Sequence, residues 1–279
     1  MSEALTVGLV LVAAALHAGW NTAVKGARDR ELTFAGVIAT SATLYLPFAL
    51  VRGLPAAQSL PWILGSASIH LLYYTMLLRG YRLGDLSQVY PIARGLGPLL
   101  VATVGGPLAG EALSLAGGVG ALLVTGGLVT LAQGRASSPA VRAALLTGVA
   151  IAGYTTCDGL GVRASGDRLA YVAWGHVATG YPYALWVMAR RRAELRSFWS
   201  TQAPVVLGGG LVSGLAYGIA IWAMSTSTLA SVASLRETSV ILAAWLGARR
   251  LGEPFGQRRV IAAAAVALGI VLISGFGLR

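Results

Sequence analysis

The sequence is poor in charged residues, and it contains one cysteine and one asparagine. Asp, Glu, Lys and Arg make up 11% of its 279 residues, whereas a soluble domain carries about 25%. Hydrophobic residues reach 56% and the mean hydropathy is +0.72. The scarcity of charge excludes an ordinary soluble domain, and the single Cys157 excludes an intrachain disulfide framework. The composition therefore predicts a polytopic membrane protein.

Acidic residues are the scarcer part of the charge: 10 Asp and Glu stand against 21 Lys and Arg, a formal net charge of +11. Such a balance can indicate nucleic-acid binding, but the basic residues lie in short loops between apolar segments. Membrane orientation and lipid headgroups explain them better, so we expect membrane lipids as partners and no nucleic acid. The first residues lack the positive region of a signal peptide, so we expect the following apolar run to remain as a helix.

Motifs of enzyme chemistry are also absent. There is no His-Glu-x-x-His, no Cys/His cluster, no Gly-x-Ser-x-Gly and no phosphate-binding loop. The glycine-rich runs lie inside apolar segments, where they favour close helix packing. We therefore expect no catalytic residue, no metal, no cofactor and no enzymatic activity.

Ten apolar segments have about the length needed to cross a bilayer of roughly 30 Å. The connections between them are short and leave no room for a soluble domain. The segments cover residues 4–24, 33–51, 60–78, 86–106, 113–132, 140–160, 169–189, 204–224, 231–248 and 259–277. The sequence thus predicts an all-α integral membrane protein with ten transmembrane helices.

The two halves of the chain, residues 1–134 and 135–279, repeat each other. Five short matches keep their order at offsets of 134 to 144 residues. The matches are 18–22 with 152–156, 46–50 with 181–185, 71 and 73 with 215 and 217, Arg94 with Arg236, and Gly110-Glu111 with Gly252-Glu253. Because each half contains five spans, an odd number, the second half must be inverted in the membrane. Two inverted five-helix repeats with a site at their interface are typical of transporters.

Lys and Arg are distributed unevenly between the two sides of the predicted bundle. Fifteen lie in the loops between spans 1–2, 3–4, 5–6, 7–8 and 9–10, and four lie on the other side. The positive-inside rule places the fifteen in the cytoplasm and both chain ends outside.

An arginine lies within the fourth span. Arg94 is about eight residues from the start of the span, or roughly 12 Å deep. A guanidinium at that depth costs at least about 2.5 kcal/mol, which predicts a functional site at a cavity. Pro91 removes a helical hydrogen bond and predicts a broken helix there. Arg236, the repeat partner on the ninth span, is expected to meet Arg94 at mid-depth, although both could instead be structural, each bound to a carboxylate or to helix-end carbonyls.

If both arginines face a cavity, the substrate carries a carboxylate or a phosphonate, which a guanidinium binds through paired hydrogen bonds. Aromatic and polar residues follow at helical spacing, where they could line the site or simply pack between helices. The candidate substrate-binding residues are Arg94, Arg236, Tyr90, Tyr73, Tyr74, His70, Trp20, Asn21, His17, Tyr154, Tyr217 and Trp222.

Proton coupling requires a group that changes its charge between two conformations. Histidine titrates near neutral pH, and a buried carboxylate can do so as well. The coupling candidates are Glu237, Asp158 and His176, with His17 and His70 as further options. Glu111 and Glu253 begin the fifth and tenth spans, where a carboxylate stabilises a helix N-terminus, so we interpret them as structural.

Five motifs carry a family resemblance: His17-Ala-Gly-Trp-Asn21, Tyr90-Pro-Ile-Ala-Arg94, Gly110-Glu111, Leu235-Arg-Glu237 and Gly252-Glu253. With the ten spans and the repeat, the whole chain resembles the drug/metabolite transporter superfamily, specifically its EamA-like ten-helix family. The resemblance implies a central cavity lined by spans 1, 3, 4, 6, 8 and 9, and alternating access. It also implies chain ends in the cytoplasm, against the charge distribution, and we retain the charge-based orientation.

We therefore expect a secondary active transporter in the bacterial inner membrane, a monomer or a homodimer. It would export or exchange small anionic or zwitterionic metabolites, with protons as a candidate coupling ion. One alternative is a multidrug transporter of cationic compounds. Alternatives from another class are a membrane-embedded sensor and an enzyme, which would need His17, His70 and His176 to converge within metal-ligand reach.

Overall fold

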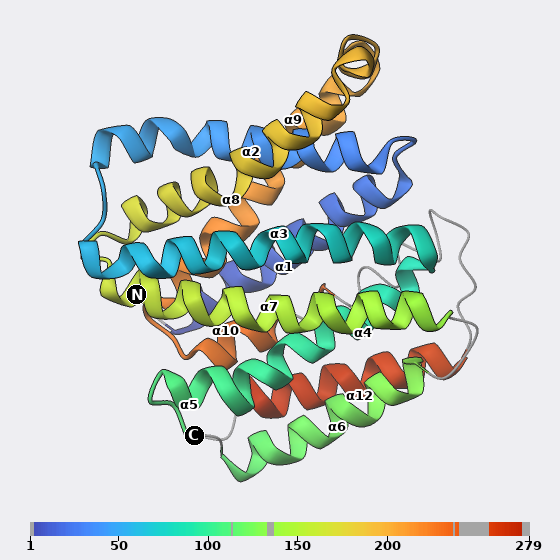
Figure 1. Ribbon diagram of the computed structural model, residues 1–279. Helices are drawn as coiled ribbons and strands as arrows, with labels where there is room; N and C mark the ends of the chain where they lie inside the picture. Colours follow the sequence, from blue (N-terminus) through green and yellow to red (C-terminus); the bar gives the residue numbers. More distant parts are fainter. Residues whose placement is uncertain (1–2, 113, 133–136, 237, 240–256, 275–279) are drawn as a thin grey trace.

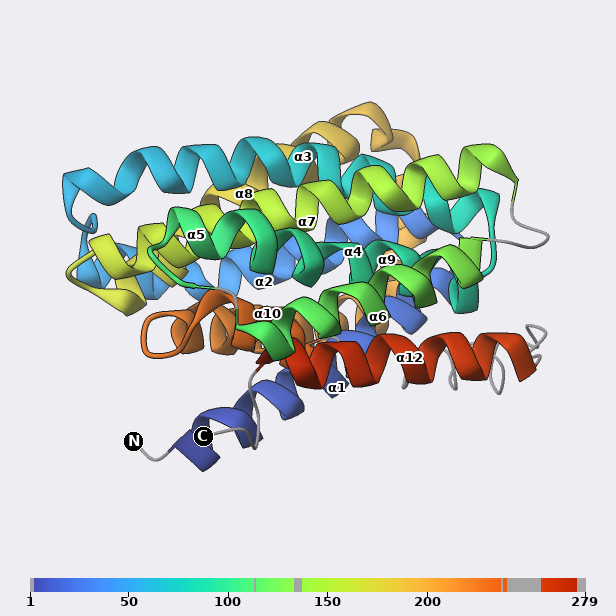
Figure 2. The same cartoon turned by 90° about the horizontal axis from the view of Figure 1, so that it is seen from below.

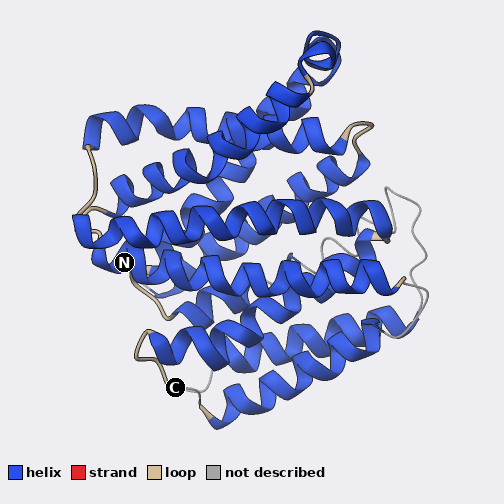
Figure 3. Ribbon diagram, in the orientation of Figure 1, coloured by secondary structure: helices blue, strands red, loops and turns tan. Residues whose placement is uncertain are grey.

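A computed structural model describes residues 3–112, 114–132, 137–236, 238–239 and 257–274. Within these ranges the regular structure is helical, and no strand occurs (Figure 3). The long helices pack side by side in a bundle, and the start of α1 and the end of α12 lie at the same end of it (Figures 1 and 2).

The described helices overlap the predicted apolar segments, although the helix of the eighth segment starts 12 residues earlier than predicted. Those of the first half are α1 (Glu3–Gly26), α2 (Arg30–Arg52), η1 (Ala57–Ser59), α3 (Leu60–Leu83), α4 (Leu86–Leu100), the π-helical turn η2 (Val101–Gly105), α5 (Gly106–Leu108) and α6 (Leu115–Ala132). Those of the second half are α7 (Ser138–Ala164), α8 (Arg168–Arg190), α9 (Arg192–Met224), α10 (Leu229–Arg236) and α12 (Gln257–Ser274). Most of the ninth predicted span, and Glu253, lie outside the described residues.

Four of these helices are long and apolar enough to cross a membrane: Ala4–Gly26, Arg30–Arg52, Ser138–Ala164 and Arg192–Met224. Shorter apolar helices cover Ile92–Leu108, Leu115–Gly127 and Val260–Ile273. A hydrophobic helix of about 20 residues matches the hydrocarbon thickness of a bilayer. The chain is a multi-pass membrane protein, as its composition predicts.

An aspartate precedes each of two helices, α2 and α8. Asp29 precedes α2 and its carboxylate accepts a hydrogen bond from the backbone N–H of Leu32 at 3.0 Å. Asp167 precedes α8 and accepts from the N–H groups of Leu169 and Ala170. Each carboxylate satisfies N–H groups that the first helical turn leaves unpaired, which fixes where the helix starts.

Small residues set how closely the helices approach. α6 packs along α12, α3 along α7, α2 along α8 and α9, α4 along α7, and α1 along α9. A Cβ atom added to Gly127 of α6 would lie 2.9 Å from the carbonyl oxygen of Ala262 in α12, and one added to Gly180 of α8 would lie 2.9 Å from that of Ile38 in α2. Only glycine permits backbones to meet at this distance.

The fourth predicted span differs from expectation. α4 runs unbroken from Leu86 to Leu100 through both of its prolines, so the expected break at Pro91 is wrong. The irregularity comes later, in η2, where the helix widens to a π turn before α5. A proline removes one hydrogen bond, and the packing of α4 against α6 and α7 holds the rest of the helix together.

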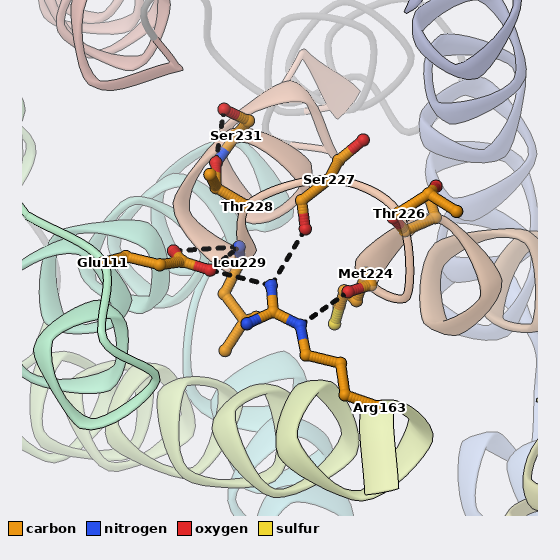
Figure 4. A network of polar contacts seen from close by, with 9 residues as sticks. Glu111, Arg163, Met224, Thr226, Ser227, Thr228, Leu229 and Ser231 are labelled. Carbon is orange, nitrogen blue, oxygen red and sulfur yellow. Dashed lines mark hydrogen bonds and ion pairs between the residues drawn. The ribbon is translucent and has the colours of Figure 1, made fainter. Parts of the chain in front are cut away.

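A polar cluster ties the α9–α10 connection to its neighbours (Figure 4). Arg163, near the end of α7, donates to the carboxylate of Glu111 at 2.8 Å and to the carbonyl oxygens of Met224 and Ser227 at 3.1 and 2.9 Å. The Glu111 carboxylate also accepts from the N–H of Leu229, the first residue of α10. Glu111 therefore stabilises a helix N-terminus, but that of α10 rather than that of its own span, because α6 begins only at Leu115.

Candidate functional site

A cavity opens among α1, α2, α3, α7, α8, α9 and α10. Its empty volume is about 500 Å³, the opening included. Nine of the predicted site residues line it: His17, Trp20, His70, Tyr73, Tyr74, Tyr154, His176, Tyr217 and Arg236. These residues come from both halves of the chain, so the fold brings together side chains that are up to 219 positions apart in the sequence.

Six lining residues were not anticipated: Phe34, Ile38, Ser41, Thr179, Gly180 and Ser213. Most belong to α2 and α8, the second and seventh spans, which the resemblance does not place at the cavity. None of the described side chains of α4 lines it. A signal was present in the sequence, because Ser41 and Thr179 are polar residues inside apolar spans, where a hydroxyl needs a hydrogen-bond partner.

The aromatic rings of the cavity pack into one connected cluster. The imidazole of His70 stacks on Tyr154, with ring centroids 4.1 Å apart, and that of His176 stacks on Tyr45 at 4.0 Å. The ring of Tyr217 meets both imidazoles edge-on, at 5.5 Å and 5.4 Å. Such contacts hold each ring in one orientation, so the cavity wall is preformed.

Arg236 carries the positive charge of the cavity. Its side chain is 97% buried, and its guanidinium carbon lies 5.7 Å from the ring centroid of Tyr217. Among the residues that the structure describes, no hydrogen bond or ion pair engages this guanidinium. Glu237, the next residue, lies outside the described residues. Burying a guanidinium is costly unless acceptors bind its N–H groups, and the cation–π contact with a ring offsets only part of that cost.

Asp158 lies behind the cavity wall. Its carboxylate, on α7, accepts hydrogen bonds from the hydroxyls of Tyr217 on α9 and Tyr171 on α8, the latter at 3.3 Å. The side chain is buried and does not line the cavity. Tyr217 therefore connects the two charges, since its hydroxyl binds Asp158 and its ring lies beneath Arg236.

Three buried ring nitrogens on the cavity wall have no hydrogen-bond partner among the described residues: Nε2 of His17, Nε1 of Trp20 and Nε2 of His176. Nδ1 of His176 lies 2.8 Å from the carbonyl oxygen of Val172 and donates to it, which leaves Nε2 of the neutral ring as an acceptor. Nε1 of Trp20 can only donate. The wall thus offers at least one donor and one acceptor, and a polar ligand would satisfy both.

The remaining predicted residues lie elsewhere. Tyr90 donates to the hydroxyl of Ser239 at 3.2 Å, and Trp222 is half-buried away from the cavity lining. Asn21 is engaged between helices, donating to the carbonyl of His17 and accepting from the hydroxyl of Tyr81, at 2.8 and 2.7 Å. Arg94 is buried in α4 within electrostatic range of His17 but outside the cavity lining.

The three histidines bear on the enzyme alternative. His17, His70 and His176 do line one cavity. Within the described part of the chain, however, no group of three or more His, Cys, Asp or Glu side chains is arranged to hold a metal ion. The histidines pack against aromatic rings instead, which suits a binding wall.

Comparison with known proteins finds a family match for the second half of the chain. The model of the EamA-like transporter family matches residues 138–275. An uncharacterised protein of Pseudomonas aeruginosa is 36% identical over 171 residues, which cover 60% of this chain and 58% of that protein. A crystal structure, titled only as that of a protein, shares the fold with a TM-score of 0.64 at 19% identity, over 98% of this chain and 97% of the other. The second half of the chain therefore matches the EamA-like transporter family of the drug/metabolite transporter superfamily, as the motifs predict.

Proposed function

We propose that this protein is a secondary active transporter of small metabolites that carry a carboxylate or a comparable anionic group, zwitterions above all. The observation that carries the proposal is Arg236, a buried guanidinium on the cavity wall with no hydrogen-bond partner among the described residues. The family match supports transport, and the cavity supplies a place for cargo.

The wall chemistry favours a zwitterion. Arg236 and Nε1 of Trp20 offer donors to a carboxylate, whereas Nε2 of His176 offers an acceptor to an ammonium or amide N–H. The aromatic cluster around His70 and Tyr154 would accept the apolar part of the same molecule. A cationic drug is disfavoured, because Arg236 is the charged group among the described lining residues, and it is positive.

Transport would proceed by rocking of two inverted five-helix repeats, residues 1–134 and 135–279, across ten membrane spans. The contacts between helices support this arrangement. If α1, α2, α3 and α6 of the first half correspond to α7, α8, α9 and α12 of the second, the most extensively packed pairs of these helices have packed counterparts. The pairing of α3 with α7 corresponds to that of α9 with α1, and the pairing of α2 with α9 to that of α8 with α3. Two further pairs each join a helix to its own counterpart in the other half, α2 with α8 and α6 with α12.

Equivalent cations at opposite ends of the bundle support the same repeat. Nζ of Lys25, at the end of α1, donates to the carbonyl oxygens of Tyr81 and Gly84, both at 2.7 Å. Arg163, 138 residues later and at the end of α7, donates to those of Met224 and Ser227. Each cation thus fastens the end of the third or eighth span to the connection that follows it.

Asp158 is the coupling group that we propose for protons, in an exporter or exchanger of the bacterial inner membrane. Its carboxylate reaches the cavity through Tyr217, whose ring lies beneath Arg236. Cargo bound to Arg236 would therefore alter the field at Asp158 through one shared side chain. His176 lines the cavity itself and is the second candidate, and Glu237 lies outside the described residues.

The test compares binding and transport in three proteins: the wild type, Arg236→Gln, and Arg192→Gln, which removes an exposed charge far from the cavity lining. Thermal shift is measured against amino acids, organic acids, phosphonates and cationic drugs, and flux is measured in proteoliposomes. We expect Arg236→Gln to weaken binding of carboxylate-bearing compounds at least tenfold, because a charge-assisted hydrogen bond contributes about 1.5–3 kcal/mol. Arg192→Gln should bind as the wild type does. Binding of cations alone, or wild-type affinity in Arg236→Gln, would refute the proposal.

A further inference from the structure

A second hollow lies between α3 and α7, apart from the central cavity. Its empty volume is about 540 Å³, the open solvent at its mouth included, and it is lined by Met76, Arg79, Pro139, Arg142, Ala143 and Leu146. α3 ends and α7 begins at the same end of the bundle, where the two helices run side by side (Figure 1). None of these residues lines the cavity of Arg236.

The two arginines of the hollow are exposed, and neither makes a hydrogen bond or an ion pair within the described part of the chain. Their neighbour Arg82 differs, since its guanidinium lies 3.4 Å from the carboxylate of Glu31. No described residue therefore compensates the charges of Arg79 and Arg142, which lie in a hollow that two helices form together. Such a pair favours an anion with several acceptor oxygens, of which phosphate is the commonest.

The start of α7 adds to the positive potential. Pro139 lies in the first turn of this 27-residue helix, and the hydroxyl of Ser137 caps it by accepting from the N–H of Ala140. The N-terminus of a long helix carries about half a positive charge. An anion beside Pro139 and Arg142 would thus meet the helix dipole as well as the guanidinium.

The position along the helices matches the headgroup layer of a membrane. Arg79 lies one turn before the end of α3 at Leu83, and Arg142 lies four residues after the start of α7 at Ser138. Further into the bundle, exposed apolar side chains continue on both helices: Leu72 is 43%, Leu146 46% and Val149 50% exposed. A lipid would present its phosphate to the arginines and lay an acyl chain along these residues.

We propose that the hollow between α3 and α7 binds the phosphate of an anionic membrane lipid through Arg79 and Arg142. The ligand chemistry is a phosphodiester that carries net negative charge, attached to acyl chains. The site is independent of the transported cargo, because it shares no residue with the central cavity.

Purified protein in mild detergent tests this by native mass spectrometry and thermal shift, with phosphatidylglycerol, phosphatidylcholine and inorganic phosphate as separate additions. The variants are Arg79→Gln/Arg142→Gln and a matched control, Arg192→Gln/Arg196→Gln, which removes two exposed arginines from the start of α9. We expect the wild type and the control to bind phosphatidylglycerol alike, and the Arg79→Gln/Arg142→Gln protein to bind it at least tenfold more weakly.

Three outcomes would overturn the proposal. The first is that both double variants bind phosphatidylglycerol equally well. The second is that phosphatidylcholine stabilises the wild type as much as phosphatidylglycerol does. The third is that inorganic phosphate alone stabilises it fully, which would assign the hollow to a free anion. If the double variant fails to fold, the single variants Arg79→Gln and Arg142→Gln are measured in its place, and each should show a partial loss.

Discussion

At the scale of single residues, a buried polar group in this bundle is defined by what it contacts. Asp158 and Arg236 are both buried, yet the carboxylate is satisfied by two tyrosine hydroxyls while the guanidinium faces a cavity. Asn21, the chain's one asparagine, is occupied between helices by His17 and Tyr81. Buried polar residues thus serve packing in one place and line a binding cavity in another, according to the groups around them.

Replacing Asp158 should show the cost of breaking such a set of contacts. In Asp158→Leu the hydroxyls of Tyr171 and Tyr217 lose their acceptor inside the bundle, so we expect the free energy of unfolding to fall by about 1–3 kcal/mol. Asp158→Asn keeps one acceptor oxygen and should lose less. Denaturant unfolding in detergent micelles measures both. A leucine variant as stable as the wild type would mean that these hydrogen bonds contribute nothing to stability.

At the scale of elements, close approach of small residues decides which helices pair. α6 and α12 meet at Gly127, where an added Cβ would lie 2.7 Å from a methyl group of Val266 and 2.9 Å from the carbonyl oxygen of Ala262. The neighbouring Gly126 is exposed and has no atom within 4 Å of the same position. Two adjacent glycines of one helix therefore have opposite roles.

The pair makes a matched test. Gly127→Ala should lower the free energy of unfolding by about 1–3 kcal/mol, because the methyl group forces α6 away from α12. Gly126→Ala should be neutral or stabilising by up to about 1 kcal/mol, since alanine has the higher helix propensity. Thermal unfolding of the two purified variants gives the comparison. Equal effects at both positions would contradict the close contact between these helices.

At the scale of the whole molecule, the distribution of arginines predicts the orientation. Arg28 and Arg192 lie on the basic side of the bundle. η1 lies on the opposite side, which has few basic residues. The positive-inside rule places η1 outside the cell.

Cysteine labelling in intact cells tests this orientation. Cys157 is the only cysteine, so Cys157→Ala gives a cysteine-free background. Gln58→Cys, in η1, should react with a membrane-impermeant maleimide, and Arg28→Cys should react only after the cells are permeabilised. Both side chains are exposed, which makes the pair comparable. The reverse pattern would place the chain ends in the cytoplasm.

Much of the fold was predictable because it depends on local sequence. A membrane span must be long and apolar, so α1, α2, α7 and α9 appear directly as hydrophobic runs. The aspartates before α2 and α8 mark those helix starts for the same local reason. The family resemblance also rests on short contiguous motifs, and it was confirmed by the match over residues 138–275.

The site was predictable only in part. The positions of Arg94 and Arg236 within their predicted spans made both candidates for the cavity, but of the two only Arg236 lines it. The sequence does not show which side of a helix faces the cavity, because that depends on the neighbours against which the helix packs. For the same reason the sequence did not predict that Ser41 and Thr179 line the cavity, or that Glu111 binds the start of α10.

The amino-acid sequence by itself determined that the chain is a membrane protein, where most of its helices run and which family its second half matches, since hydrophobic length, capping residues and contiguous motifs act locally. The tertiary structure alone decided which polar side chains line a cavity and which ones form hydrogen bonds between packed helices. Those outcomes depend on contacts between helices from different halves of the chain, and the rotation of one helix against another is fixed by close packing rather than by the order of residues along either helix.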